Sequence, residues 1–111
     1  MTEFSKSQKK IVRELVQLGL RRECKSFTDE IARCAKSSEW ETRDPHELYC
    51  ELYQKVTSFD KHIERRYDSA RDPYDFMTLV SLFRDGVLTT DDIARLDPEV
   101  QSELVRVKDL I

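Results

Sequence analysis

Two residues near the middle of the chain have the spacing of a metal-binding pair. His46 and Cys50 are four residues apart, so on a helix both side chains project from one face, and zinc accepts both ligand types. Two ligands do not make a site, and a third would have to come from elsewhere in the chain. His46 also falls in the first turn of a predicted helix, where a polar residue is ordinary. We therefore interpret the pair as structural and predict no metal and no cofactor.

Acidic side chains could supply acid–base chemistry, but their surroundings do not favour it. Glu47 and Glu51 could form a carboxylate pair, yet no nucleophile or phosphate-binding loop accompanies them. Asp60, His62 and Glu64 are alternate residues, which point to different faces of a helix. The chain has no GxGxxG, P-loop, HExxH or GxSxG motif and only two histidines and two glycines. An enzyme with an unrecognised carboxylate or metal site is thus our third hypothesis, and no catalytic residue is assigned.

Charge is distributed unevenly along the chain. Residues 1–25 contain seven basic and three acidic side chains, whereas residues 72–111 contain four basic and nine acidic ones. Four basic residues of the first predicted helix form a basic ridge opposite its apolar side: Lys6, Lys10, Arg13 and Arg21. The ridge could bind a nucleic-acid backbone weakly and in a salt-dependent way, which is our second hypothesis. We favour complementation by the acidic C-terminal third, within the molecule or between two copies, because the net charge is −3 and no polar recognition helix is evident.

Apolar side chains recur with helical periodicity throughout the chain. The spacing and the start and stop signals predict long helices over 6–36 and 45–69, a mostly apolar third helix over 73–85, and short helices near 91–95 and from 98 onwards. Gly86 is expected to end the third helix in a left-handed conformation, with Val87 contacting Leu82. We predict a single all-α domain spanning residues 1–111. In this small bundle the first two helices pair antiparallel, and the third is buried.

The first predicted helix carries more apolar surface than one neighbour covers. Its two apolar stripes make an arc of about 200°, where about 100° suffices for one packing partner. The second stripe, formed by Val12, Val16 and Leu20, is therefore a predicted interface. Gly19 costs about 1 kcal/mol relative to alanine in a helix, which close approach of another helix would explain. Our leading hypothesis is a protein–protein interaction or regulatory module that self-associates, with a homodimer as one form.

The remaining features concern the compartment and the core. Cys24, Cys34 and Cys50 are an odd number of cysteines without a CxxC pair, and we expect them to be reduced and mostly buried. The chain has neither a signal-peptide-like start nor an apolar run of membrane-spanning length, so we predict a cytoplasmic protein with no membrane partner. Trp40 is expected to close the end of the core.

Three short segments resemble features of small bacterial all-helical proteins of unassigned function. These segments are the opening FSKSQKKIVREL, the Arg66-Tyr67 pair before Asp72-Pro73, and the run Asp85-Gly86-Val87-Leu88-Thr89. Such proteins have a basic FSK-type start, a long helix, and a DP-initiated helix that closes on a G-h-L-[ST] turn. The similarity covers most of the chain. It implies a bacterial source and a helical fold but no activity, so no functional residues are carried over.

Overall fold

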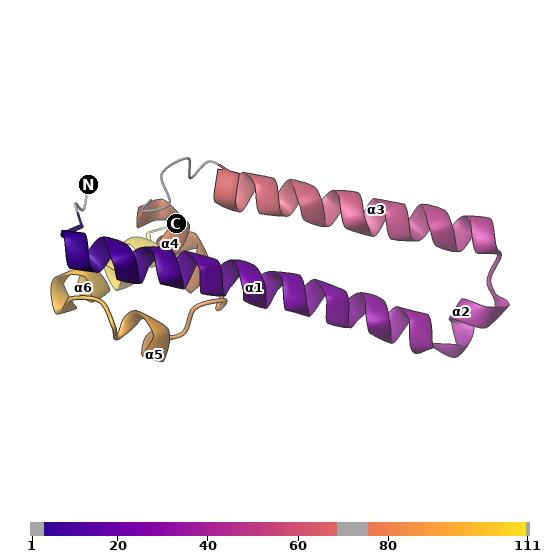
Figure 1. Cartoon of the computed structure of the whole chain (residues 1–111), viewed down its shortest axis with the longest axis horizontal. Coiled ribbons are helices and arrows are strands. Elements are labelled where there is room, and N and C mark those ends of the chain that lie inside the picture. The colour runs from indigo at the N-terminus through magenta and orange to yellow at the C-terminus, as the bar shows by residue number, and fades with distance from the viewer. Residues whose placement is uncertain (1–3, 69–75, 111) are drawn as a thin grey trace.

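A long helical hairpin dominates the architecture. The computed structural model describes residues 4–68 and 76–110, and all regular structure in these ranges is helical, which confirms the all-α prediction. Two long antiparallel helices form the hairpin, and the short C-terminal helices gather at one end of it (Figure 1). The molecule measures 54 × 26 × 25 Å, because the hairpin extends well beyond the core. The predicted bundle therefore exists only at one end.

Helix α1 (Lys6–Lys36) has the predicted bounds. The Ser5 hydroxyl accepts a hydrogen bond from the backbone N–H of Gln8 at 3.3 Å, as expected for an N-cap. Ser5 and Gln8 have the spacing of a capping box, but its reciprocal half does not form, because the Gln8 side chain accepts instead from the backbone N–H of Asp97 at 2.9 Å. Gln8 is buried and so links the start of the last helix to α1.

The turn of the hairpin is more helical than predicted. A short helix, α2 (Ser38–Thr42), occupies part of the segment that we expected to be an irregular connection. Helix α3 (Pro45–Ile63) then starts at its predicted N-cap, where Asp44 accepts from the backbone N–H of Glu47 at 3.1 Å. It ends six residues short of the predicted boundary at Ser69, and a π-helical segment, η1 (Glu64–Asp68), continues it. Ser69 itself lies outside the described residues.

The C-terminal part contains α4 (Phe76–Arg84), α5 (Thr90–Ile93) and α6 (Pro98–Lys108). The predicted stop of the third helix is confirmed: Gly86 has a φ of 75°, and the N–H of Val87 donates to the carbonyl of Leu82 at 3.0 Å. The predicted start at Asp72-Pro73 lies outside the described residues, as does Ile111.

The core lies where α4, α5 and α6 cover the N-terminal half of α1 (Figure 1). As predicted, α4 is largely buried. Gly19 is also buried, and a Cβ there would lie 2.9 Å from a methyl carbon of Leu82, so close helix approach does explain this glycine. The buried apolar side chains are Val12, Leu15, Phe76, Leu79, Val80, Leu82, Phe83, Leu88, Ile93, Leu96, Val100 and Leu104.

The wide apolar arc of α1 is mostly covered by the chain itself. Val12 is 0% exposed, so its predicted role in an interface with another molecule is wrong. Ile11 and Leu18 pack against the core on one side of it and Val16 on the other, so the extra width serves intramolecular packing. Val16 and Leu20 are half-buried, and their role in an interface stays a prediction.

Two other expectations about burial need correction. All three cysteines are free, but only Cys24 and Cys34 are partly buried, and Cys50 is exposed. Trp40 is half-buried at the hairpin turn, at the opposite end of α1 from the core, and so does not close that core. Within the described ranges, no helix has the length and apolar content needed to cross a membrane.

Candidate interaction surfaces

The hairpin holds together through partly buried side chains, and one of its faces is polar. No residue of α3 is buried. The rings of Phe27 and Phe59 stack between the helices, with centroids 4.3 Å apart and planes 6° from parallel. Beside this stack, Lys55 of α3 lies 3.5 Å from the Glu30 carboxylate of α1. Ion pairing across the helices therefore marks one face of the hairpin.

The other face is apolar and aromatic. Tyr49, Tyr53 and Val56 are 65%, 63% and 52% exposed, and steps of four and three residues place them on one stripe of α3. At about 100° per residue, this stripe lies at least about 100° around α3 from Lys55. Cys24 and Ile31, both half-buried, fall on the matching side of α1. We call these five residues the hairpin strip.

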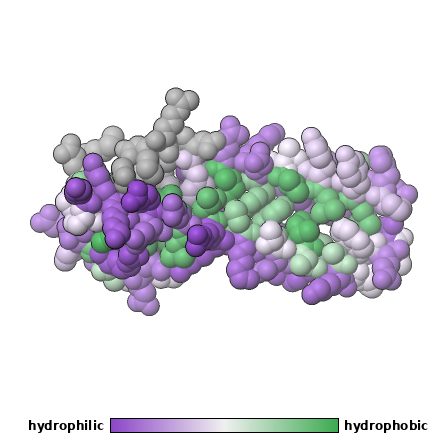
Figure 2. All heavy atoms as spheres, in the orientation of Figure 1, coloured by the Kyte–Doolittle hydropathy of each residue, from purple (hydrophilic) through white to green (hydrophobic). Residues whose placement is uncertain are grey.

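Apolar surface gathers between the two helices of the hairpin, with hydrophilic surface along both outer edges (Figure 2). Contiguous exposed apolar surface of this kind marks interaction sites in proteins. Helical periodicity in the sequence did not identify Tyr49 and Tyr53 as a surface. The feature of the sequence that could have indicated this surface is the alternation of aromatic and charged residues along α3.

The basic ridge is exposed along its whole length. Lys6, Lys10, Arg13 and Arg21 form no ion pair among the described residues. The pKa of the neighbouring Glu14 is lowered, mainly by a hydrogen bond from Arg95 and further by Lys10 and Arg13. The four basic side chains of the ridge are therefore exposed to solvent, and two of them lie close enough to Glu14 to stabilise its carboxylate.

The acidic C-terminal third does complement α1, but not at the ridge. Arg22, which lies off the ridge, donates to Asp92 at 2.6 Å and to the carbonyl of Val87 at 2.8 Å. The arginine lowers the pKa of Asp92 to about 2. We expected the acidic C-terminal third to complement the ridge within the molecule or between two copies. Within the molecule, the contact is made by Arg22, a different residue of the same helix.

An acidic tip lies at the end of the hairpin, far along α1 from the ridge (Figure 1). It consists of Glu39, Glu41, Asp44 and Glu47, all exposed. None of the four forms an ion pair with another described residue, whereas nearby Glu51 pairs with Arg43. The sequence signal was four carboxylates within nine residues, which the charge balance of the two chain ends did not reveal.

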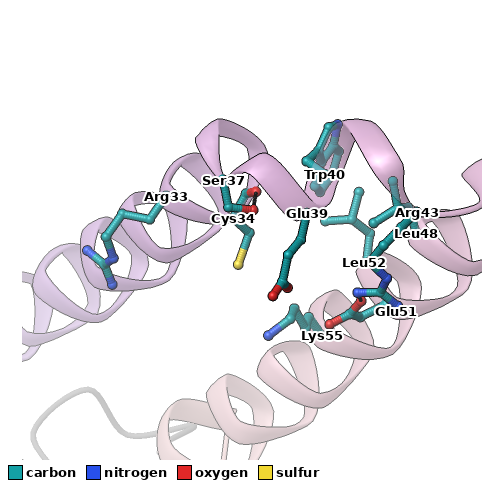
Figure 3. A pocket seen from close by; sticks show the side chains of 10 residues that line it. All are labelled: Arg33, Cys34, Ser37, Glu39, Trp40, Arg43, Leu48, Glu51, Leu52 and Lys55. Atoms are coloured by element: carbon teal, nitrogen blue, oxygen red, sulfur yellow. Dashed lines mark hydrogen bonds and ion pairs between the residues drawn. The ribbon is translucent and has the colours of Figure 1, made fainter.

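A cleft of about 320 Å³ opens at this end between α1, α2 and α3. Trp40, Leu48 and Leu52 line its apolar part. The side chains of Cys34 and Glu39 project toward Lys55 (Figure 3). The cleft is small and open, and it adds apolar surface at the end of the hairpin.

Neither the His46–Cys50 pair nor the Glu47–Glu51 pair is joined by further ligands or catalytic groups among the described residues. The Cys50 sulfur lies 3.8 Å from Nε2 of His46, and no group of three His, Cys, Asp or Glu side chains that could hold a metal forms within residues 4–68 and 76–110. Glu47 is exposed, and Glu51 is engaged by Arg43. This geometry supports no acid–base site at either pair.

A buried charge cluster joins the hairpin to the core, and sequence reasoning missed it. The Arg66 side chain is 8% exposed and lies 3.1 Å from Glu23 and 2.7 Å from Asp85, while His62 lies 2.9 Å from Glu23. Asp60 and Glu64, grouped with His62 in the sequence, are exposed. Burial raises the pKa of the neighbouring Tyr67 hydroxyl. The cluster connects α1, η1 and the end of α4, so its role is structural.

No known protein family, curated protein or solved structure matches the chain. The resemblance to small bacterial helical proteins therefore stays a prediction. Functional inference rests on the three surfaces above: the hairpin strip, the basic ridge and the acidic tip.

Proposed function

We propose that this chain is a cytoplasmic protein–protein interaction module whose binding surface is the hairpin strip. The observation that carries the proposal is the exposure of Tyr49, Tyr53 and Val56 on a helix with no buried residue. Tyrosine is enriched at protein interfaces because it combines a large apolar ring with a polar end and few rotatable bonds. A binding role explains why these large side chains are exposed, whereas a surface that only contacts water does not explain their exposure.

The physics of helix packing supports the same conclusion. A helix in a globular protein is stabilised mainly by burying its apolar side, and isolated helices are marginal in water. The distal half of the hairpin buries only the line of contact between α1 and α3, where Phe27 stacks on Phe59. A third or fourth helix from a partner would cover the remaining apolar side.

Site-specific photo-crosslinking in the living cell tests this function. A benzophenone amino acid replaces Tyr53 in one variant and Gln54, an exposed polar neighbour, in the control. We expect a discrete protein adduct from position 53, none from position 54, and loss of the adduct when Val56→Asp is added. Equal labelling from both positions, or no adduct from position 53, would contradict the proposal.

A second candidate is a nucleic-acid accessory protein. The observation in its favour is that the four cations of the basic ridge are exposed and without ion pairs among the described residues. Contact with about four phosphates predicts a slope of about −3.6 in log K against log salt concentration. Fluorescence anisotropy with a labelled DNA duplex measures this slope, and Lys10→Glu with Arg13→Glu should abolish binding. Binding that ignores either salt or these substitutions would eliminate this candidate.

Among the described residues, no arrangement of side chains supports the third hypothesis, an enzyme with a carboxylate or metal site. We therefore do not propose it.

A further inference from the structure

The hairpin strip and the basic ridge lie on one face of the molecule. Arg13 and Ile31 are eighteen residues apart on α1, as are Lys6 and Cys24, and eighteen residues make about five full turns. Each pair therefore projects in the same direction, whereas Leu15, which is buried in the core, points about 160° away from Arg13. Figure 2 shows this face, with hydrophilic surface over the N-terminal part of α1 and apolar surface between the two helices of the hairpin. The core helices cover a different side of α1.

Contacts between the two helices of the hairpin fix the distance from the strip to the ridge. Lys55 of α3 lies 3.5 Å from Glu30 of α1, and the helices run antiparallel, so Tyr53 is level with about residue 32 of α1. The exposed Gln17, which follows Arg13 by about one turn, lies about 15 residues before that level. Tyr53 and Gln17 are therefore about 23 Å apart along the axis of α1. A single helix of moderate length can reach both.

The charge of the ridge indicates the chemistry of a partner. Its four basic side chains form no ion pair among the described residues, and the nearby Glu14 carboxylate is held by Arg95. Charges that meet across protein interfaces are arranged to be complementary. At the core end of the strip, Asp60 is exposed on α3, seven residues from Tyr53 and so on nearly the same line of that helix. Acidic side chains of a partner are therefore favoured over the ridge and disfavoured beside the strip.

The shape of the apolar surface indicates a helix. This surface is bounded along both outer edges of the hairpin by hydrophilic side chains (Figure 2). Helices pack with their axes about 8–10 Å apart, so a third helix that lies along α1 and α3 contacts Ile31 on one side and Tyr53 on the other. A flat lipid surface would also meet the hydrophilic edges, which favours a helix as the occupant. From Lys6 to Ile31 the face is about 38 Å long, the length of a helix of about 25 residues.

We propose that the hairpin strip and the basic ridge together bind one amphipathic helix of another protein, apolar where it lies on the strip and acidic where it lies on the ridge. The proposal rests on the proposed function of the strip as a binding surface. Burial of apolar side chains supplies affinity, and pairing of the acidic segment with the ridge fixes the position and direction of the helix along α1. Taken as about 10 Å wide, the footprint is on the order of 400 Å² per partner, below the standard of about 800 Å², so the complex is expected to be reversible.

Photo-crosslinking from two positions of the full chain tests the arrangement in cells. A benzophenone amino acid replaces Tyr53 in one variant and Gln17 in a second, and mass spectrometry identifies the partner residues that each one labels. Ser26 is the matched control position, because it is exposed and lies nine residues from Gln17, on the opposite side of α1. We expect positions 53 and 17 to label one protein at sites about 15 residues apart, with acidic residues around the second site, and position 26 to label nothing.

A binding titration tests the apolar contact. The segment identified by crosslinking is synthesised as a fluorescent peptide and titrated with the full chain, and fluorescence anisotropy gives the dissociation constant. Val56→Asp should raise this constant about tenfold, because a charge would be buried against the apolar side of the peptide. Ser58→Asp is the control, since Ser58 is exposed on the opposite side of α3, and it should change the constant less than about twofold. Equal effects of the two substitutions would overturn the proposed site.

Charge reversal in the same titration tests the acidic contact. Arg13→Glu should raise the dissociation constant about fivefold at low salt, and the difference should shrink as salt screens the charges. Arg33→Glu is the matched control, because Arg33 is also exposed on α1 but points about 160° away from Arg13. Equal effects of the two reversals, or an effect of Arg13→Glu that ignores salt, would overturn the pairing with an acidic segment.

The outcomes separate this inference from the proposed function. If position 53 labels a protein but position 17 labels none, or labels a basic or uncharged segment, the function stands and the acidic helix is wrong. A second copy of this chain as the labelled protein, or nucleic acid labelled from position 17, would also overturn the inference alone. Lipid labelled from position 53, or no adduct there, would remove both.

Discussion

Substitution of Glu23 by leucine should destabilise the fold far more than its position on a surface helix indicates. The Glu23 side chain is 9% exposed and faces two donors, with Arg66 at 3.1 Å and His62 at 2.9 Å. Glu23→Leu leaves the buried guanidinium with Asp85 alone, and Asp85 is 38% exposed.

The magnitude follows from the burial of the remaining charge. Breaking a buried ion pair by removing one partner costs about 3–5 kcal/mol, and the retained contact with Asp85 places the expected loss near the lower end, at about 3 kcal/mol. For a chain of this size, that corresponds to a fall of roughly 10 °C in melting temperature. Because a buried pair can be replaced by apolar residues of similar volume, Glu23→Leu combined with Arg66→Met should lose only about 1 kcal/mol.

Urea unfolding followed by circular dichroism measures these differences. The matched control is Asp29→Asn, which removes an exposed i,i+4 pair with Lys25 and should cost less than about 0.5 kcal/mol. The reasoning fails if Glu23→Leu unfolds within about 0.5 kcal/mol of the unaltered chain. It also fails if the double variant is less stable than the single one, since the two effects would then not be coupled.

Two further outcomes follow from other contacts. The Asp92 pKa of about 2 lies below its ordinary value of 3.8, so the Arg22–Asp92 contact stabilises the fold above about pH 4 and is lost as the pH falls towards 2. Because Arg22 is 41% exposed, the effect is about 1 kcal/mol, and Asp92→Asn should flatten the stability–pH curve across that window in acid titrations of urea midpoints. Gly86→Ala should cost about 1–2 kcal/mol in urea unfolding through its φ of 75° alone, because no atom lies within 4 Å of the added Cβ. An unchanged midpoint for Gly86→Ala would refute the assignment of this glycine as an obligatory cap.

Local sequence signals specify the helices of this protein and most of the residues at which they begin and end. Ser5, the Asp44-Pro45 start and Gly86 act through hydrogen bonds and backbone angles within a few residues, so their effects can be recognised without knowledge of the fold. The burial of α4 was equally clear, since a helix that is apolar on most sides must be enclosed. The close approach of another helix at Gly19 was predicted because glycine destabilises a helix interior, and tight packing would explain its presence there.

Which apolar residues face water depends on how the helices pack together, and local sequence patterns do not specify this packing. The sequence assigned Val12 to an interface because periodicity gives the width of an apolar side but not the number of neighbours that cover it. The contacts Glu23–Arg66 and Gln8–Asp97 join residues 43 and 89 positions apart, and no local pattern encodes such distances. The distance between the basic ridge and the acidic tip likewise depends on how far the hairpin extends beyond the core. Local interactions made α1 a long helix with two apolar stripes, and the position of α4, α5 and α6 at one end of it left α3 with an apolar side exposed.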